Sequence, residues 1–497
     1  MLMSNRSTVA KTFIFLFAAT LFLGCAQKTL HTPAESRNFT WPSTHDEIHD
    51  FCNAAARHSQ ILEKEVFGQS VEGRELVVVK AAKKSNVTET EKLRVLLFAQ
   101  QHGNEQAGKE GALLLIRDLA EGKFDHWFDH MEVWIVPQVN PDGGEVNQRR
   151  NALNRDLNRD HRSMEAPETY ALHALFREWL PHVTIDVHEY QPYRDSWAEF
   201  GGYKQFDMQV GVNTNINIDE RIRMFSLQEV LPFLEEYLAT HGYSFQNYIV
   251  GPPPSDGITR HSTTDIDDGR HGFGIRNTLS FIFEGINGRD GFIEKLERRS
   301  LCQLETKRGL LEFLYINKDT VVHMVNIARN DLINSQTGEM VAIQTQFVSD
   351  GESLIMPLKS SVTGADTMVV VENYKPLVKP KLQVERPRGY LIPRNDELLM
   401  EWVEKHGLKS LTNIPAGTDV YGWNLRPIRF DPPGEPLKTA VDISDRHERY
   451  LFIPIQQLHT NFLVLALEPL SDIGLIDDAL FGYLLDETDW YPIYRVE

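Results

Sequence analysis

Three residues of types that bind metal ions follow two apolar stretches in the first 190 residues of the chain. His102 and Glu105 are three positions apart directly after an apolar stretch, and His188 follows a second apolar stretch. Zinc in hydrolases is held by two imidazoles and one carboxylate, which leaves its fourth position open to water. These three residues are therefore a candidate zinc site. The His-x-x-Glu pair alone is a weak signal, because a chain with 18 histidines contains roughly one such pair by accident.

Four short apolar runs, rich in β-branched and aromatic residues, are typical of buried parallel strands. They are Leu93 to Ala99, Val133 to Val139, Val183 to Val187 and Thr278 to Phe283. Polar residues follow each run: His102 with Glu105, Asn140-Pro-Asp-Gly, His188-Glu-Tyr, and Glu284-Gly. In open α/β sheets, ligands bind beyond the carboxyl ends of the strands. The four polar clusters are therefore expected to converge on one crevice.

Taken in order, these motifs resemble those of a known family, the zinc carboxypeptidases of the M14 (carboxypeptidase A-like) type. The resemblance is carried by His102-x-x-Glu105, Asn140-Pro-Asp-Gly143, the run from Arg149 to Arg159, His188, and Phe283-Glu284. The Asp-Leu-Asn-Arg segment of that run is the most specific signature. The resemblance covers roughly residues 45 to 330. It implies one zinc ion per chain and an α/β fold with a mixed, mostly parallel sheet flanked by helices.

The resemblance also implies the roles at the metal. His102, Glu105 and His188 would hold the zinc ion. Glu284 would act as general base, taking a proton from water and passing it to the leaving amine. Asp156 would orient a zinc-ligating imidazole, which we expect to be that of His102.

Three further residues match positions that bind substrate in the family. Arg149 would polarise the scissile carbonyl and stabilise the oxyanion, although the adjacent Arg150 leaves the register open by one residue. Asn158 and Arg159 would hold the free α-carboxylate of the substrate, a task for which a guanidinium fork is suited. The alternative is that this charge-rich run, residues 149–162, is a solvated basic loop.

One segment departs from the pancreatic-type pattern, in which a tyrosine that closes over the substrate stands about twenty residues before the catalytic glutamate. The segment from Ser262 to Phe273 contains no tyrosine. It should also line the side-chain pocket, where Asp267 and Asp268 would favour a basic terminal residue. Arg270 or Arg276 would instead favour an acidic residue or contact another carboxylate. The preferred terminal residue therefore stays open.

The N-terminus is typical of an export signal. Arg6 and Lys11 precede the apolar run Thr12 to Leu23, which is too short for a stable membrane span. The residues Leu21 to Cys25 resemble a bacterial lipobox, so we expect cleavage before Cys25 and lipid attachment to its sulfur. The protein would then be a periplasmic or outer-membrane lipoprotein of the cell envelope. An ordinary secreted or membrane-tethered precursor is the alternative.

A chain of 497 residues suggests more than one domain. We expect a signal peptide (1–25), a polar tether (26–42), a zinc carboxypeptidase-like catalytic domain (43–335) and a smaller β-rich C-terminal domain (336–497). Helical patterns begin at Ser43 and recur at Gly108 to Ala120, Pro167 to Leu180, Asp219 to Thr240, and Phe292 to about Leu332.

Cysteine content and net charge limit the other partners. If Cys25 is acylated, Cys52 and Cys302 remain, either as one bridge or as two buried thiols. The net charge of −19 argues against nucleic acid as a partner. No feature of the sequence indicates an oligomeric state.

The resemblance thus implies a zinc-dependent metallocarboxypeptidase that hydrolyses the C-terminal bond of peptides with a free carboxylate. A second hypothesis keeps the zinc site but changes the substrate, to murein stem peptides or N-acyl amino acids. A third, of a different class, is a non-catalytic binding scaffold, against which the complete ligand set and Glu284 count.

Overall fold

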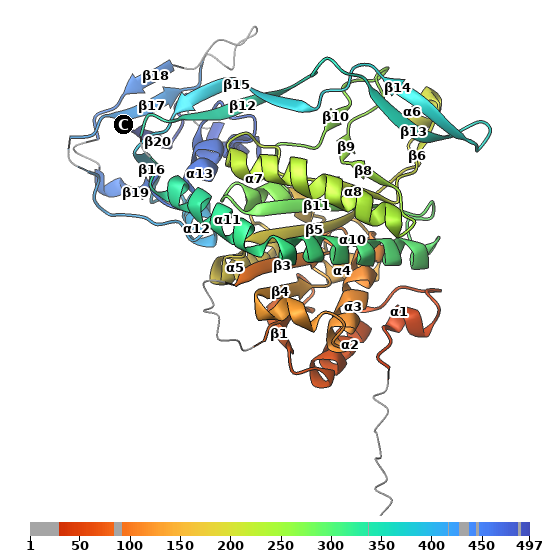
Figure 1. Cartoon of the computed structure of the whole chain (residues 1–497). Helices are drawn as coiled ribbons and strands as arrows, with labels where there is room; N and C mark the ends of the chain where they lie inside the picture. The colour runs from red at the N-terminus through yellow and green to blue at the C-terminus, as the bar shows by residue number, and fades with distance from the viewer. Residues whose placement is uncertain are drawn as a thin grey trace, which may run out of the picture.

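The computed structural model describes residues 29–83, 92–335, 337–415, 417–426, 437–443, 447–485 and 489–497. Its largest element is an eight-stranded mixed sheet with the strand order β1-β2-β4-β3-β5-β11-β7-β8 (Figure 1). These strands are β1 Leu62–Gln69, β2 Glu75–Ala81, β3 Leu93–Ala99, β4 Met131–Val136, β5 Val183–Tyr190, β7 Met208–Gly211, β8 Phe245–Asn247 and β11 Leu279–Ile286.

The four predicted parallel strands lie side by side in the middle of this sheet. β4, β3, β5 and β11 are neighbours, and each pair of neighbours runs parallel. Their side chains are buried on both faces, which explains why the sequence shows continuous apolar runs rather than alternation. β1, β2 and β7 add antiparallel pairings at the two sides. The sheet is therefore mixed and mostly parallel, as predicted.

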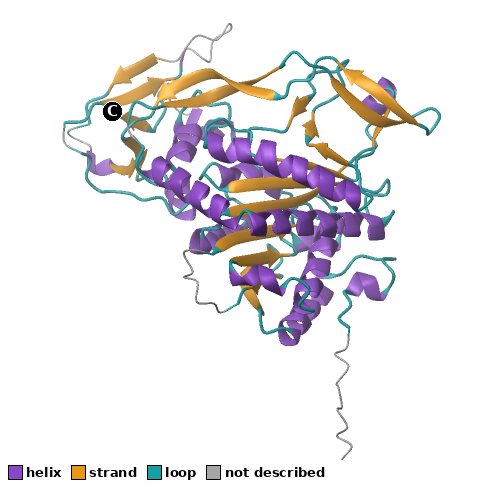
Figure 2. Ribbon diagram, in the orientation of Figure 1, coloured by secondary structure: helices purple, strands orange, loops and turns teal. Residues whose placement is uncertain are grey.

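Helices cover both faces of the sheet (Figure 2). One face packs on α2, α3, α8, α10 and α11, and the other on α5 and α9. Within β3, Val95 and Leu97 join the first core, and Leu96 and Phe98 join the second. The helices are α2 His45–His58, α3 Gln106–Ala120, α5 Pro167–Trp179, α7 Glu220–Phe225, α8 Leu231–Thr240, α9 Gly269–Gly274, α10 Leu296–Ile316 and α11 Lys318–Ile333.

Local sequence signals explain where several helices begin. The predicted start near Ser43 is a capping box at Thr44: its hydroxyl accepts from the Glu47 amide, and the Glu47 carboxylate accepts from the Thr44 amide. The long pattern predicted from Phe292 to Leu332 is two helices that meet at Asn317. Shorter helical segments of the described residues include α1 Pro33–Ser36, α4 Pro141–Glu145, α6 Asp195–Phe200 and a π-helical turn, Ser226–Val230, between α7 and α8.

The chain beyond residue 336 is rich in β-structure, as predicted. β12 Met340–Val348 pairs with β15 Leu377–Glu385. A five-stranded antiparallel sheet has the order β18-β17-β20-β16-β19. Its strands are β16 Gly389–Pro393, β17 Val420–Asn424, β18 Leu437–Ala440, β19 Tyr450–Pro454 and β20 Tyr494–Val496; the helices of this part are α12 Glu397–Lys405 and α13 Thr460–Leu467.

One hairpin of this C-terminal part reaches back to the first part of the chain. β13 Leu354–Ser360 pairs with β14 Asp366–Val371 on one side and with β6 Gly202–Lys204 on the other. The apolar core is also continuous, since Ile343 and Leu463 belong to the same buried cluster as Val187 of β5. The boundaries of the predicted domains stay predictions.

Two other expectations concern thiols and membranes. Cys52 and Cys302 are separate buried free thiols, so the alternative of a bridge between them is wrong. The predicted export signal and Cys25 lie outside the described residues. Among the residues that are described, no helix combines the length and apolar character that crossing a bilayer requires.

Candidate metal centre and active site

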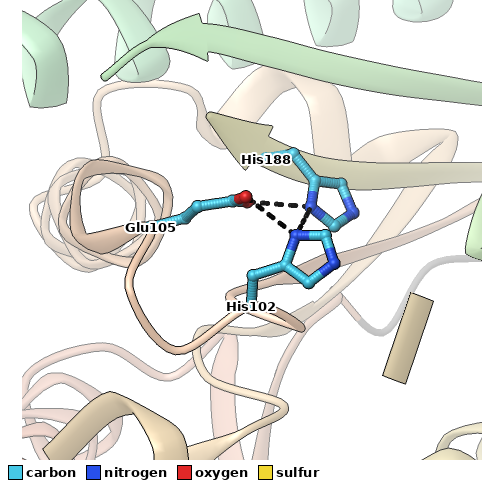
Figure 3. A group of neighbouring side chains, drawn as sticks. All are labelled: His102, Glu105 and His188. Atoms are coloured by element: carbon cyan, nitrogen blue, oxygen red, sulfur yellow. Dashed lines mark hydrogen bonds and ion pairs between the residues drawn. The ribbon is translucent and has the colours of Figure 1, made fainter. Parts of the chain in front are cut away.

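Three side chains meet at the carboxyl ends of β3 and β5 (Figure 3). His102 Nδ1 lies 2.8 Å from Glu105 Oε1, and His188 Nδ1 lies 2.9 Å from Glu105 Oε2. The two Nδ1 atoms are 3.0 Å apart. The candidate ligand atoms all lie within 4.8 Å of one another, and the three residues are buried.

The other nitrogen of each imidazole faces a carboxylate. His102 Nε2 is 3.0 Å from Asp156 Oδ1, and His188 Nε2 is 2.8 Å from Asp186 Oδ1. A neutral imidazole that donates from Nε2 presents a lone pair at Nδ1. Two such lone pairs then face each other and the Glu105 carboxylate, an arrangement that is repulsive unless a cation lies between them. The donor set of two imidazoles and one carboxylate is that of catalytic zinc, so the residues present fit this ion.

The charged groups of the cluster shift one another's pKa values. Burial would raise the pKa of Glu105, but the imidazoles of His102 and His188 hold it well below its ordinary value. Burial would likewise lower the pKa of His188, but the carboxylates of Asp186 and Glu105 raise it well above its ordinary value. Glu105 is therefore an anion, and the two carboxylates draw positive charge to His188.

The backbone explains why these ligands converge. Glu105 is the residue before α3, so its side chain lies at the turn between β3 and that helix. Its Oε2 also accepts a hydrogen bond from the Glu189 amide at 3.0 Å, which fixes the turn to β5. Gly103 within the turn packs directly against the backbone of Gly143 and Gly144, where a Cβ atom would overlap them.

Glu284 lies beside the metal ligands because β11 runs parallel to β5, with Glu284 paired to His188 in the register. Burial raises the pKa of Glu284, and the nearby Glu105 carboxylate raises it further. His188 and a hydrogen bond from the Tyr248 hydroxyl act in the opposite direction. A buried carboxylate with a raised pKa is suited to accept and return a proton.

Tyr248 is a residue that the sequence did not reveal. It lies between β8 and β9 (Ile249–Val250), 36 positions before Glu284 rather than about twenty. Burial raises its pKa well above the ordinary value, and the Glu284 carboxylate adds to the shift. The hydroxyl therefore stays protonated and available as a donor. Only the folded position of β8 next to β7 could have indicated this contact.

The structure distinguishes the two adjacent arginines. Arg149 Nε donates to Asp156 Oδ2 at 2.9 Å, and its Nη1 lies 3.2 Å from His102 Nδ1. Arg150 instead donates to the Asn154 carbonyl oxygen at the surface. Arg149 is therefore the residue of the pair that faces the metal site.

Asn158 and Arg159 occupy a short 3₁₀ turn, Leu157–Arg159, which Asp156 caps through a hydrogen bond from the Asn158 amide. Asn158 Oδ1 accepts from the Gly269 amide at 2.7 Å and from Gln101 Nε2 at 3.2 Å, so its orientation is fixed. Burial opposes the charge of Arg159, but surrounding carboxylates, Asp267 first among them, raise its pKa.

Asp156 joins these groups. Burial would raise its pKa, but the His102 hydrogen bond and the guanidinium groups of Arg149 and Arg159 hold it well below the ordinary range. It touches His102 and Arg149 at once through its two oxygens. One carboxylate thus positions a metal ligand and a guanidinium together.

The predicted site residues line one cavity of about 290 Å³. Its walls include His102, Glu105, Arg149, Asn158, Arg159 and Glu284. The remaining predicted residues do not line the cavity but contact residues that do: His188 contacts Glu105, and Asp156 contacts His102. Arg149, Asn158 and Arg159 of the charged run thus face a concave site, whereas Arg150 and residues 152–154 are exposed.

Two buried residues that support the site were also missed. Asp186 lies two positions before His188 on β5, and Gln101 Nε2 donates to both oxygens of Asp186, at 2.9 and 3.0 Å. Gln101 Oε1 in turn lies 2.8 Å from His161 Nε2. A polar residue at the second position before a ligand on an apolar strand was the available signal for Asp186.

Comparison with known proteins gives matches of three kinds: a family model, related sequences and solved structures. The zinc carboxypeptidase family model, M14, matches residues 48–198. Carboxypeptidase 2 of Trichophyton rubrum is 28% identical over 484 residues, which cover 92% of this chain and 87% of that protein. Carboxypeptidase Z of Mus musculus is 32% identical over 124 residues, covering 21% of this chain and 19% of the relative.

A solved structure with a similar chain path is that of a putative carboxypeptidase A from Shewanella denitrificans. It shares 19% sequence identity with this chain, at a TM-score of 0.44. The alignment covers 56% of this chain and 70% of that one.

Proposed function

We propose that this protein, a zinc metallocarboxypeptidase of the M14 family, removes single C-terminal residues from peptides in the bacterial cell envelope. The observation that carries the proposal is the convergence of His102, Glu105 and His188 beside Glu284 in a cavity that also holds substrate-binding candidates. The proposed substrate is a peptide with a free C-terminal carboxylate.

When bound, the zinc ion supplies Lewis acidity, which polarises a carbonyl group and makes water more acidic. His102, Glu105 and His188 would hold it, with Asp156 and Asp186 fixing the two imidazoles. The chain's own groups carry out the remaining tasks.

Glu284 would act as general base and then as general acid. It would take a proton from the attacking water and give it to the nitrogen of the leaving amino acid. Its pKa is raised by burial, which favours uptake of the proton from water. Tyr248, which donates to Glu284, would orient the carboxylate.

Arg149 would stabilise the negative charge that develops on the carbonyl oxygen. Its guanidinium is fixed by Asp156 next to His102, which places a permanent positive charge beside the metal site. Asn158 and Arg159 would hold the α-carboxylate, because both line the cavity and Arg159 forms no ion pair within 4.0 Å among the described residues. This requirement for a free carboxylate would make the enzyme an exopeptidase.

The test is hydrolysis of a peptide library with free and amidated C-termini, read by mass spectrometry with and without a zinc chelator. Chelator-sensitive loss of single C-terminal residues from the free-carboxylate peptides alone supports the proposal. Cleavage within chains, or equal cleavage of the amidated peptides, contradicts it. Cleavage of murein stem peptides in place of ordinary peptides would favour the second hypothesis.

The location in the envelope is a separate part of the proposal. It is supported by the charged and apolar pattern of residues 1–25 and by the lipobox-like end at Cys25. Fractionation of cells that produce the wild type or Cys25→Ala tests it. We expect the wild type in the membrane fraction and the variant released from it; a wild type found in the cytosol would refute export.

A further inference from the structure

The cavity contains a second guanidinium that the proposed mechanism does not use. Arg270 belongs to α9 and lines the cavity together with Tyr248, Val250, Thr263 and Ile282. Its side chain is fully buried. A buried guanidinium needs an acceptor for each of its N–H groups, either from the protein or from the substrate.

The position of Arg270 is fixed by three acceptors. Its Nη1 donates to Ser262 Oγ, and its Nη2 donates to Thr263 Oγ1 at 2.6 Å and to Asp268 Oδ2 at 3.0 Å. Gly211 on β7 allows the close approach, because a Cβ atom there would lie 2.6 Å from Nη1. The guanidinium is therefore held rigidly against the sheet.

These acceptors do not use all the donors of Arg270. A guanidinium has five N–H groups, and the three contacts engage three of them. Nε is buried and has no hydrogen-bond partner within the described part of the chain. A further N–H of Nη1 also remains, so Arg270 can still donate to an oxygen that enters the cavity.

The carboxylates of the cavity are already engaged. Asp268 Oδ1 accepts from the His271 amide at 2.6 Å, and its Oδ2 accepts from Thr263 Oγ1 as well as from Arg270. Glu189 is bound through both oxygens by Arg299. Because Glu105 faces the metal site and Glu284 is the proposed base, no carboxylate among the described residues that line the cavity is left for a basic side chain.

The other charged residues that the sequence offered for the pocket lie elsewhere. Asp267 does not line the cavity. Arg276 donates to the Gly272 carbonyl oxygen and lies over the Phe462 ring, away from it. Of the four candidates, the structure therefore leaves Arg270 as the one that faces the cavity with unused donors.

Further positive charge lies close to Arg270. Arg194 lines this cavity and also an adjoining one. Tyr248 and Val250 belong to the walls of both cavities. Lys204 lines that adjoining cavity, but burial lowers its pKa to about 7, so it carries only part of a positive charge at neutral pH. Arg270 is paired with Asp268, so the positive charge left at this wall after Arg159 has bound the α-carboxylate is mainly that of Arg194, and Arg270 adds its unused N–H donors.

We propose that the cavity selects peptides whose C-terminal residue is glutamate or aspartate, and that Arg270 is the specificity-determining residue that binds the acidic side chain. This inference rests on the carboxypeptidase function proposed above and names the substrate class of the same site. Hydrogen bonds between a guanidinium and a carboxylate are charge-assisted and stronger than those to a neutral amide.

The experiment compares two substrates that differ only in this charge. Peptides identical except for a C-terminal Glu or Gln are hydrolysed by the full-length protein loaded with zinc, with Leu and Lys peptides alongside. We expect kcat/KM for the Glu peptide to exceed that for the Gln peptide by roughly 10- to 100-fold, the range typical of hydrogen bonds to charged groups. The Lys peptide should be the poorest substrate of the four.

The variant Arg270→Met tests the residue assignment. We expect its Glu to Gln ratio to fall to about one, because Met carries no charge and has no N–H group to donate to the acidic side chain. Arg221→Met removes an exposed arginine outside the cavity and should keep the wild-type ratio. If Arg270→Met does not fold, Arg270→Lys serves instead and should retain a ratio above one but below that of the wild type.

The possible failures are distinguishable. A wild type that hydrolyses the Gln, Leu or Lys peptide at least as well as the Glu peptide overturns the inference and leaves the carboxypeptidase function intact. A wild type with the expected ratio that persists in Arg270→Met overturns the role of Arg270. A wild type that releases no residue from any of the four peptides refutes the proposed function, and the inference with it.

Discussion

The two metal-binding imidazoles are fixed in the same way, each by a carboxylate on its far nitrogen. Asp156 contacts His102, and Asp186 contacts His188. This arrangement keeps each Nδ1 unprotonated toward the metal and raises the basicity of the ring. The ability to hold zinc therefore depends on two aspartates as well as on the three ligands.

Substitution of Glu284 should lower the rate of hydrolysis without changing zinc binding. We expect Glu284→Gln to lower kcat/KM by roughly 10²- to 10⁴-fold, because the amide cannot transfer the proton. The zinc content, measured by mass spectrometry of the native protein, should stay at one per chain. A variant with more than a tenth of the wild-type kcat/KM would contradict the role of Glu284.

Asp186 should act through metal affinity rather than proton transfer. We expect Asp186→Asn to weaken zinc binding by about 10- to 100-fold, since the amide no longer fixes His188 as its carboxylate does. Competition with a fluorescent chelator measures this change. Asp129→Asn, which alters an exposed carboxylate, is the matched control and should leave the affinity unchanged. Equal affinities in the two variants would rule out this role.

At the level of residues, the sequence predicted the groups that carry chemical signatures. The spacing of His102 and Glu105, and the run from Arg149 to Arg159, could be read because each motif is local. Tyr248 could not, since a contact between distant segments leaves no mark in either one, and the one signal for Asp186 was a polar residue within an apolar strand. Arg149 could be distinguished from Arg150 only when the side-chain directions were known.

At the level of elements, the site depends on where strands end and turns begin. β3, β5 and β11 lie side by side and end at the same edge of the sheet, so their last residues meet. The turn after β3 is the tightest part of this arrangement. Gly103 lies there against the backbone that follows Asn140, and the Asn140 side chain caps α4.

The close packing at Gly103 has a measurable consequence. We expect Gly103→Ala to displace the turn that carries His102 and Glu105, because the new methyl group would overlap the backbone of Gly143 and Gly144. Zinc content and activity should fall together. Gly482→Ala adds the same group where no atom lies within 4 Å and should behave as the wild type. Full zinc content in Gly103→Ala would contradict this account.

The four central strands were predictable and the outer ones were not, for a physical reason. A parallel strand buried on both faces is a continuous apolar run, as in Leu93 to Ala99. β1 has a single buried residue, Leu62, and is rich in charge, and β8 has three residues, all half-buried. Such strands form through their neighbours rather than through their own sequence.

At the level of the whole molecule, several histidines are buried without charge. Burial lowers the pKa of His182 to about 2 and those of His161 and His261 to about 4. Unfolding exposes each of these histidines to water, in which the imidazole has its ordinary pKa of about 6.5. Their contribution to stability is thus complete above pH 6.5 and decreases as the pH falls toward the folded-state values.

Acid should therefore destabilise the protein before most carboxylates titrate. Between pH 7 and pH 5, each such histidine should lower the free energy of unfolding by about 2 kcal/mol, because only the unfolded chain takes up the proton. Urea unfolding at the two pH values measures the loss. His182→Asn keeps an acceptor for the Arg94 amide but cannot titrate, so its loss should be smaller by about 2 kcal/mol. An equal loss in both proteins would refute the assignment.

The pairing of β6 with β13 joins two segments that are about 150 positions apart in the sequence. Leu358 of β13 is the register partner of Lys204, which lines the cavity next to the proposed active site. An insertion or deletion in the hairpin of β13 and β14 would thus be transmitted to that wall without changing any residue that touches the metal. During evolution, or in a directed-evolution library, substrate preference could diverge through this hairpin while the hydrolytic machinery stayed constant.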